Sequence, residues 1–312
     1  MATTPTSGQS SLTRDCTRES DSGAGLEAAT LCGGHRYSDE PLQESVIAMG
    51  MGSQEAQGLL WGVEPEGWAS HESNHSPLFR AMMEATDIGS GKNVLDIGCG
   101  AGHSSVLIKE AGATVVGVDA AQGLVDHANK TFAGIDFQVG GIEELSFGDD
   151  EFDVVFAANS VQYAADLGIA LRELARVCKP GGSIVAGLFG PPEGVSYKPV
   201  LDALGQFMPK PPPGGKPGGP FRLSAPGVLE DGFTSAGIDV SGTGVANCPF
   251  EYESWDEFWR GTRAAGPTQM AIGLAGVDAV EEATRKAVEP FTDRDGSIAF
   301  DTNVFIYVVG QA

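Results

Sequence analysis

Basic residues are scarce in this chain of 312 residues. It contains 19 Lys and Arg against 42 Asp and Glu, which gives a net charge of −23. Such a chain repels the phosphate backbone of nucleic acids, and its few cations form no evident stripe along the sequence. We therefore expect no nucleic-acid partner, and we attribute the acidity mainly to a requirement for solubility.

Cysteines and long apolar runs are also few. The five cysteines, at positions 16, 32, 99, 178 and 248, are an odd and scattered set with no C-x-x-C spacing. This pattern argues against a disulfide framework and against a zinc site, so we expect no metal. No apolar run approaches the roughly 20 residues of a membrane span, and the N-terminus lacks the apolar segment of a secretory signal. These absences predict a cytoplasmic protein with no membrane partner.

The composition changes near Leu59. Residues 1–56 are rich in Ser, Thr, Gly and Glu without sustained periodicity, which predicts a disordered or weakly ordered extension. The remaining residues, 57–312, are expected to form one domain, because a chain that is 41% hydrophobic can bury a sizeable core. Between Gly67 and Thr86, small and apolar residues fit one or two helices that could cover a cleft.

The centre of the chain alternates between short apolar runs and helical segments. Strands are predicted at 93–97, 114–118, 136–139, 153–157 and 183–188. A helix beginning near Asp166 is expected to stop at Pro180-Gly181-Gly182. This alternation is typical of a doubly wound α/β fold with helices on both faces of a parallel sheet.

After residue 190 the pattern loosens. The segment 211–220, rich in Pro and Gly, is either a mobile flap over an acceptor pocket or a surface linker. A helix is predicted from Ser224 to Gly237, and two last strands at 238–248 and 303–309. Residues 254–290 look helical, and their aromatic side chains either face a cleft or pack in the core: Trp255, Phe258 and Trp259.

One stretch carries most of the chemical information. The apolar run from Val94 ends in an acid and opens into alternating glycines up to Gly102, and a second apolar run ends at Asp119. This pattern describes a strand, a tight loop in which a ligand can touch backbone, a helix, and a second strand whose terminal carboxylate can bind a ribose. It predicts a cofactor that contains a nucleoside.

Details of the loop distinguish between such cofactors. A dinucleotide site has the spacing G-x-G-x-x-G, but here glycines stand at 98, 100 and 102, and His103 occupies the place of the third dinucleotide glycine. Asp96, just before the loop, would repel a pyrophosphate and attract an ammonium group. A cofactor with a cationic end therefore fits better than NAD.

These residues resemble the class I S-adenosylmethionine (SAM) dependent methyltransferases, especially those of small molecules. The resemblance runs over about residues 60–190, through Asp119, the segment 140–145, Phe152 to Val155, and the segment 174–182. It implies a Rossmann-like methyltransferase fold with a mostly parallel seven-stranded sheet, closed by a last pair of strands, one of them antiparallel. It also implies a lid made of the N-terminal helices and of insertions at about 190–227 and 254–290.

The resemblance assigns the SAM site residue by residue. Asp96 is expected to orient the methionine ammonium directly or through water, Gly98 to Gly100 to allow close backbone approach, and Asp119 to accept from the ribose hydroxyls. The family often has an acid where Gly141 stands, so the backbone of Ile142 and Glu143 is expected to hold the adenine. The complete predicted set is Asp96, Gly98, Cys99, Gly100, Gly102, Asp119, Ala120, Gly141, Ile142, Glu143 and Asn159.

Three residues are candidates for the acceptor side. Tyr163 follows the fourth strand, which borders the methyl-transfer site in the resembled family, and it could bind the acceptor, face the sulfonium through a cation–π contact, or only pack. His71 and His75 are four residues apart and could act as general base for an oxygen or nitrogen acceptor, or form a solvent-exposed pair. His103 and His127 are expected in helices beside the cleft, without a catalytic role.

The function predicted from the sequence is methyl transfer from SAM to oxygen, nitrogen or carbon of a small metabolite in a biosynthetic pathway. Because in-line transfer depends mainly on positioning, the cofactor site is more predictable than a catalytic residue. A peptide or protein methyltransferase and a non-catalytic SAM-binding module remain alternatives, and an NAD-dependent oxidoreductase is disfavoured by Asp96 and His103. Neither the acceptor nor the oligomeric state follows from the sequence.

Overall fold

The computed structural model describes residues 54–209 and 219–312. The predicted N-terminal extension, 1–56, lies outside this part except for Gln54 to Ala56, which begin helix α2 (Gln54–Trp61). The Pro- and Gly-rich segment predicted to be a flap or a linker also lies outside it, apart from Gly219 and Pro220.

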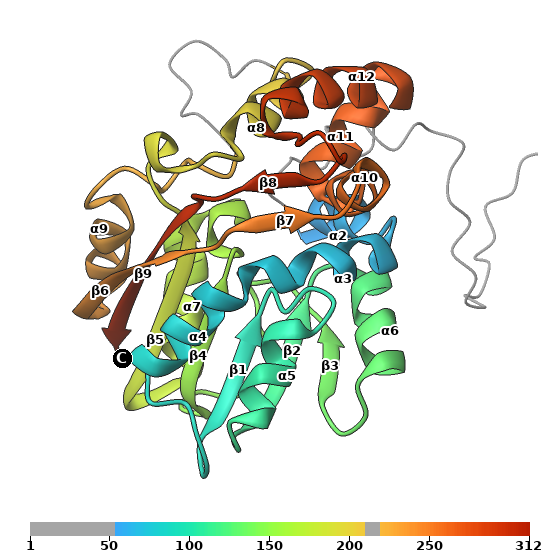
Figure 1. The fold of residues 1–312 in the computed structure, drawn as a ribbon. Helices are drawn as coiled ribbons and strands as arrows, with labels where there is room; N and C mark the ends of the chain where they lie inside the picture. The colour runs from blue at the N-terminus through green and yellow to red at the C-terminus, as the bar shows by residue number, and fades with distance from the viewer. Residues whose placement is uncertain (1–53, 210–218) are drawn as a thin grey trace, which may run out of the picture. The chain divides into compact units, whose positions relative to one another are not determined.

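A seven-stranded sheet forms the centre of the structure (Figure 1). Its strand order is β3-β2-β1-β4-β5-β9-β6, and of these seven strands β9 alone runs opposite to the other six. The predicted doubly wound, mostly parallel sheet is confirmed, including the antiparallel strand near its end. The strands are β1 (Asn93–Ile97), β2 (Thr114–Asp119), β3 (Asp136–Val139), β4 (Phe152–Ala158), β5 (Cys178–Phe189), β6 (Asp239–Asn247) and β9 (Val304–Gln311).

Helices cover both faces of this sheet. One core layer joins one face to α4 (Ser76–Ala85), α5 (His103–Glu110) and α6 (Gln122–Thr131). The other joins the opposite face to α7 (Leu167–Val177) and α9 (Val228–Ser235). Helix α7 shows why the chain folds this way: Leu171 and Leu174 are fully buried on one side, and the Asp166 side chain caps the first turn by accepting from the Ile169 amide at 2.9 Å.

A cap of further elements lies at the end of the sheet where the parallel strands finish (Figure 1). Its helices are α2, α3 (Pro65–Glu72), α8 (Lys198–Gly205), α10 (Trp255–Ala264), α11 (Gly266–Ala275) and α12 (Val277–Val288). Its short turns of 3₁₀-helix are η1 (Ser73–His75), η2 (Val161–Tyr163), η3 (Pro192–Gly194) and η4 (Glu289–Phe291). A two-stranded sheet, β7 (Phe250–Tyr252) with β8 (Ile298–Phe300), belongs to the same cap and was not predicted from the sequence.

Strand β5 begins earlier than predicted. Helix α7 ends at Val177, and Cys178 already pairs with Phe152 of β4. Pro180 disfavours helical backbone in the residue before it, and Gly181 adopts a φ of 74° beside the point where the register shifts. The Pro-Gly-Gly stretch is thus an irregularity within the strand and not the stop signal of the helix.

Two predictions for the C-terminal half need correction. Helix α9 begins at Val228 instead of Ser224, because Gly227 precedes it with a φ of 83°. The helical segment 254–290 is three helices, divided at Ala265 and Gly276. Its aromatic side chains pack in the core or on the surface and do not line the cleft described below.

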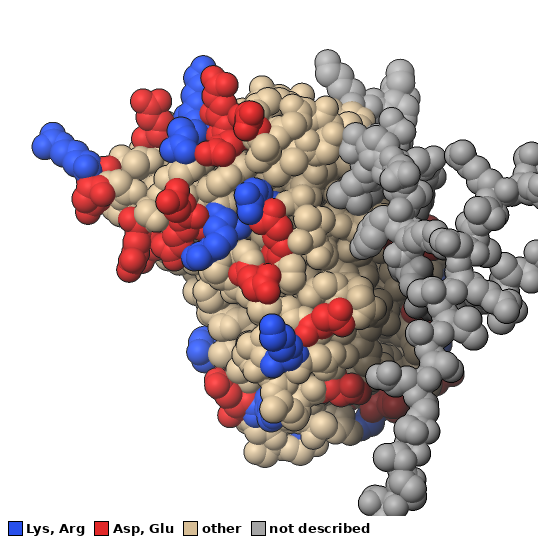
Figure 2. All heavy atoms as spheres, turned by 90° about the vertical axis from the view of Figure 1, so that its right-hand side faces the viewer, with Lys and Arg blue, Asp and Glu red and all other residues tan. Residues whose placement is uncertain are grey.

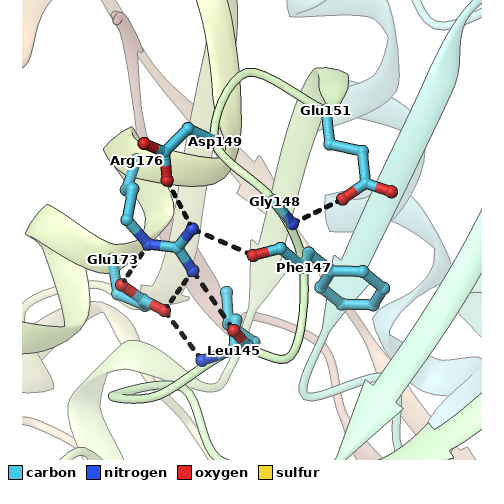
Figure 3. A network of polar contacts seen from close by, with 7 residues as sticks. All are labelled: Leu145, Phe147, Gly148, Asp149, Glu151, Glu173 and Arg176. Carbon is cyan, nitrogen blue, oxygen red and sulfur yellow. Dashed lines mark hydrogen bonds and ion pairs between the residues drawn. The ribbon is translucent and has the colours of Figure 1, made fainter.

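An arginine joins α7 to the loop before β4 (Figure 3). The Arg176 guanidinium donates to both carboxylate oxygens of Glu173, to Asp149, and to the backbone carbonyls of Leu145 and Phe147, at 2.6–3.2 Å. Glu173 in turn accepts from the Leu145 amide at 2.8 Å. These bonds fix the chain between residues 140–144 and β4.

Charged residues of both signs lie side by side on the face shown in Figure 2, with basic residues next to acidic ones. In the part of the chain that the structure describes, no helix is long and apolar enough to cross a membrane.

Candidate active site

A cleft opens where the strand order of the sheet reverses. Strand β1 has β2 on one side and β4 on the other, which is the place where ligands bind in open α/β sheets. The cleft is lined by the ends of these strands, by the lid helices α2 and α3, and by residues of α8 and of the start of α11. The elements predicted to form a lid thus surround it.

The glycine loop after β1 has backbone that favours glycine. Gly98, Gly100 and Gly102 have φ values of 75°, 58° and 100°. A Cβ on Gly98 would overlap Ser160, and one on Gly100 would overlap the Glu72 carboxylate and come within 3.0 Å of the Trp68 indole nitrogen. The loop is therefore closely packed, and Gly98 and Gly100 line the cleft.

Asp119, at the end of β2, holds this loop in place. Its Oδ2 accepts from the Gly100 amide and its Oδ1 from the Ala121 amide, both at 2.9 Å. Burial raises the pKa of this carboxyl, and the backbone donors act in the opposite direction. The side chain is half-buried and lines the cleft beside Ala120.

Asp96 does not line the cleft. Its side chain is 1% exposed, and Oδ2 accepts from the hydroxyls of Ser104 and Ser105, each at 2.6 Å. Burial raises its pKa to about 6, although the two serines lower it. Oδ1 has no hydrogen-bond partner in the described part of the protein. Because Ser104 does line the cleft, an ammonium group could be reached through this serine or through water.

The other predicted cofactor residues divide into two groups. Ile142, Glu143 and Asn159 line the cleft, whereas Cys99, Gly102 and Gly141 do not. Gly102 is the residue before α5, packed against Phe137 and Phe132, and Cys99 is 1% exposed. These three shape the loops that carry the lining residues.

Glu72 of α3 lines the cleft as well and was missed by the sequence analysis. Its Oε1 accepts from the Ala101 amide at 3.2 Å and from the Trp68 indole at 3.3 Å, and its Oε2 from the His103 amide at 3.0 Å. Burial raises its pKa to about 8 despite these backbone donors. The only signal in the sequence is the Trp68–Glu72 spacing of four, which does not reveal that α3 packs on the glycine loop.

His71 and His75 are buried, so the alternative of a solvent-exposed pair is wrong. Their exposed fractions are 5% and 4%, and both line the cleft. Burial lowers the pKa of His71 to about 3 and that of His75 to about 4, so both imidazoles are neutral near pH 7. His71 belongs to α3 and His75 to η1.

Tyr163 lies in η2 and also lines the cleft. Its ring packs edge-to-face on Trp61 of α2, with centroids 5.6 Å apart, and burial raises the pKa of its phenol. The structure thus brings all three acceptor-side candidates to one cleft. His103 and His127, expected beside the cleft without a catalytic role, lie in α5 and α6 and are not among the lining residues.

The ionisable lining residues have one sign of charge. They are the acids Asp119 and Glu143 and, above its pKa of about 8, Glu72, together with neutral histidines and tyrosines, and no Lys or Arg from 54–209 or 219–312 lines the cleft. Asn159 Oδ1 and Ser160 Oγ, both on lining residues, are buried without a hydrogen-bond partner among the described residues. Such a site fits a ligand that carries a positive charge and hydrogen-bond donors. No group of three or more potential metal ligands occurs in the described segments.

The middle of the chain is similar to known methyltransferases. Residues 95–186 match the sequence model of a family described as "Methyltransferase domain". An uncharacterized protein of Mycobacterium tuberculosis is 37% identical over 113 residues, 35% of this chain and 41% of that protein. The malonyl-[acyl-carrier protein] O-methyltransferase of Yersinia pestis is 38% identical over 117 residues, 38% of this chain and 41% of that enzyme. The ubiquinone biosynthesis O-methyltransferase of Azorhizobium caulinodans is 37% identical over 99 residues, 30% and 39% of the two chains.

The chain thus spans about two fifths of the length of the curated relatives that it matches.

Solved structures share the fold over more of the chain. The YcgJ protein of Bacillus subtilis has a TM-score of 0.50 at 22% identity, covering 77% of this chain and 99% of its own. A chain of the Haloferax volcanii complex that contains the Trm112 methyltransferase activator has a TM-score of 0.52 at 18% identity, covering 81% and 96%.

Proposed function

We propose that this chain, whose residues 95–186 match the family described as "Methyltransferase domain", is of the class I SAM-dependent type and transfers a methyl group from SAM to a small-molecule acceptor. The observation that carries the proposal is the cleft at the reversal point of the sheet, with its glycine loop, three acids and no cation. SAM is a sulfonium cation with an ammonium group and a ribose, and each of these finds a complementary group here.

The fit can be followed group by group. Asp119 would accept from the ribose hydroxyls while it keeps the Gly100 amide. Ile142 and Glu143 would bind the adenine, since no side chain at Gly141 can do so. Asp96, through Ser104, would orient the ammonium group. The buried Asn159 Oδ1 and Ser160 Oγ offer further unused hydrogen-bonding atoms.

When bound, SAM would supply a methyl group on a good leaving sulfur, and the protein has to place an acceptor atom about 3 Å from it and in line. The lid residues Trp61 and Trp68, together with Tyr163 of η2, would exclude water from this side of the cleft. These aromatic side chains would also stabilise a positive charge bound next to their faces. Correct positioning of the two reactants supplies roughly 7–11 kcal/mol of the barrier.

A small acceptor is favoured over a peptide because the cleft is surrounded by lid elements. Besides α2 and α3, it is lined by Tyr197 and Leu201 from the 190–227 insertion and by Pro267 and Thr268 from the 254–290 insertion. A peptide substrate requires an open groove along the surface. The relatives named as O-methyltransferases act on molecules of different kinds, so the acceptor has to be inferred from the cleft itself.

Isothermal titration calorimetry tests the proposal. The protein should bind SAM and its demethylated product, and Asp119→Ala should weaken SAM binding at least about tenfold, because hydrogen bonds to a charged group contribute about 1.5–3 kcal/mol each. Asp126→Ala, on the exposed surface of α6, is the matched control and should bind like the wild type. Binding of NAD without binding of SAM would overturn the proposal.

A further inference from the structure

The two histidines of the cleft are not equivalent, because their neighbours fix different tautomers. The Asn74 side-chain amide donates to the Tyr252 hydroxyl at 3.2 Å. The proton of that hydroxyl then points to Nδ1 of His71, 2.8 Å away. With Nδ1 accepting, the neutral His71 ring carries its proton on Nε2 and is a hydrogen-bond donor.

His75 has the opposite arrangement. Its Nδ1 lies 3.3 Å from the backbone carbonyl oxygen of Glu72, which can only accept. The proton of the neutral ring is therefore on Nδ1, and Nε2 has a free lone pair. Neither Nε2 atom has a hydrogen-bond partner within 54–209 and 219–312, and both rings line the cleft.

The surroundings of the pair are aromatic. The Phe250 ring lies 5.3 Å from each imidazole between centroids, Tyr197 lies 6.3 Å from His71, and Phe79 lies 6.1 Å from His75. All three also line the cleft. Aromatic walls of this kind favour a ring compound, which packs against them edge-to-face or offset.

The charge of the residues that line the cleft limits the class of acceptor further. An anionic acceptor such as a carboxylate or a phosphate would find no Lys or Arg among the described lining residues, and it would lie near the acids Asp119 and Glu143. An uncharged acceptor avoids this repulsion. A malonyl group carries a carboxylate, so the cleft does not suit the acceptor named for the Yersinia pestis relative.

We propose that the acceptor is an uncharged ring compound with a weakly acidic hydroxyl, that His75 removes the hydroxyl proton, and that His71 orients the acceptor by donating a hydrogen bond. This proposal rests on the methyltransferase function proposed above. In the transfer step the acceptor oxygen forms a bond to the methyl carbon while the carbon–sulfur bond breaks, and the electron pair stays on sulfur. The hydroxyl proton moves to Nε2 of His75, so the positive charge of the sulfonium ends on an imidazolium and the total charge of the cleft is unchanged.

The roles of Tyr252 and Asn74 follow from this assignment. They are positioning residues, because they act on His71 from the far side of the ring. Tyr252→Phe removes the group that holds Nδ1 as acceptor, and the proton of His71 can then move to Nδ1. The variant should raise KM for the acceptor more than it lowers kcat, because the donor to the acceptor is lost while the base at His75 remains.

The test is a transfer assay with isotopically labelled SAM and simple acceptors. Catechol, 4-nitrophenol and 8-hydroxyquinoline represent ring hydroxyls, benzoate and malonyl-coenzyme A represent carboxylates, and aniline represents amines. We expect label in at least one ring hydroxyl and none in the carboxylates or the amine. His75→Gln should lower kcat by about 10²–10⁴-fold, the usual contribution of a general base, and keep the wild-type affinity for SAM in calorimetry.

Each outcome is decisive. Label in a carboxylate or in aniline, no label in any ring hydroxyl, or a His75→Gln variant with the wild-type kcat would overturn the proposal. Calorimetry separates this failure from failure of the general function: a protein that binds SAM but methylates none of the ring hydroxyls refutes only the acceptor class. If His75→Gln does not fold, Tyr252→Phe still tests the pair, since an unchanged KM for the acceptor would contradict the assigned tautomers.

Discussion

The Glu72 carboxylate accepts a hydrogen bond from the backbone amide of His103, with 3.0 Å between Oε2 and the nitrogen. This bond joins the lid helix α3 to the first turn of α5, where the helix dipole favours negative charge. The other carboxylate oxygen binds the Ala101 amide within the glycine loop. One side chain thus couples the position of the lid to the conformation of the loop that is proposed to hold the cofactor.

This coupling should make stability depend on pH in a defined direction. Burial raises the folded-state pKa of Glu72 to about 8 from an ordinary value of 4.5. Between these two values the folded protein holds this proton and the unfolded chain releases it. The contribution of Glu72 to the free energy of unfolding is therefore fully present below about pH 4.5 and is lost as the pH rises toward 8. Glu72→Gln removes this titration. We therefore expect the free energy of unfolding of the wild type, relative to the variant, to fall by on the order of 2–4 kcal/mol between pH 5 and 8.

Chemical denaturation at several pH values measures this difference. Taking the difference between the two proteins cancels the titration of other groups, including His71 and His75, whose lowered pKa values cost stability as the pH falls below about 6.5. Glu84→Gln, at an exposed position of α4, is the control and should show no such trend. A difference for Glu72→Gln that is constant over the pH range would contradict the prediction.

Gly100→Ala should affect both stability and cofactor binding. The φ of 58° disfavours any residue with a Cβ by about 1–2 kcal/mol, and the added atom would also overlap the Glu72 carboxylate. Displacing Glu72 opens the loop, so we expect at least a tenfold loss of SAM affinity by calorimetry. Gly91→Ala is the matched control: its φ is 87°, but the new Cβ would meet open space. Gly91→Ala should lose stability and keep its SAM affinity. Equal SAM affinities of Gly91→Ala and Gly100→Ala would refute the proposed role of the glycine loop in binding SAM.

The sequence predicted the parts of the fold that are specified locally. The apolar run into Asp96, the glycines and the acid at Asp119 belong to one short strand–loop–helix–strand unit, so their spacing alone indicates their positions. The same holds for α7, which the Asp166 cap and a buried apolar stripe define. Even there, the bulge at Gly181 was missed, because pairing with β4 extends β5 to Cys178.

The acceptor side depends on contacts between distant segments and could be predicted only in part. His71 and His75 were found as a pair by spacing, but their burial results from packing against Phe250 and Tyr252, nearly 180 residues further along the chain. Glu72 was missed for the same reason, since its partners belong to the glycine loop. Asp96 is buried, and its carboxylate accepts from two serines of α5, a packing that its place before the glycine loop did not reveal.

Arg176 should contribute more to stability than an ordinary surface cation. Its ion pair with Asp149 is worth little, because the Asp149 side chain is 74% exposed. Arg176 also bonds to Glu173, whose side chain is 16% exposed, and to the backbone carbonyls of Leu145 and Phe147 (Figure 3). Water reaches these groups less easily than it reaches Asp149. We expect Arg176→Ala to lower the free energy of unfolding by about 1–3 kcal/mol in urea denaturation.

Two further variants show whether this loss comes from the bridging geometry or from charge alone. Lys198→Ala removes a cation that forms an ion pair with Asp202, one helical turn away, and it should cost less than about 0.5 kcal/mol. Arg176→Lys keeps the charge but cannot span a carboxylate and two carbonyls at once, so it should recover less than half of the loss. The Leu145 amide donates a hydrogen bond to Glu173. Hydrogen exchange at this amide should accelerate in both Arg176 variants and not in Lys198→Ala. If Arg176→Lys restored full stability, charge and not the bridge would hold the loop before β4.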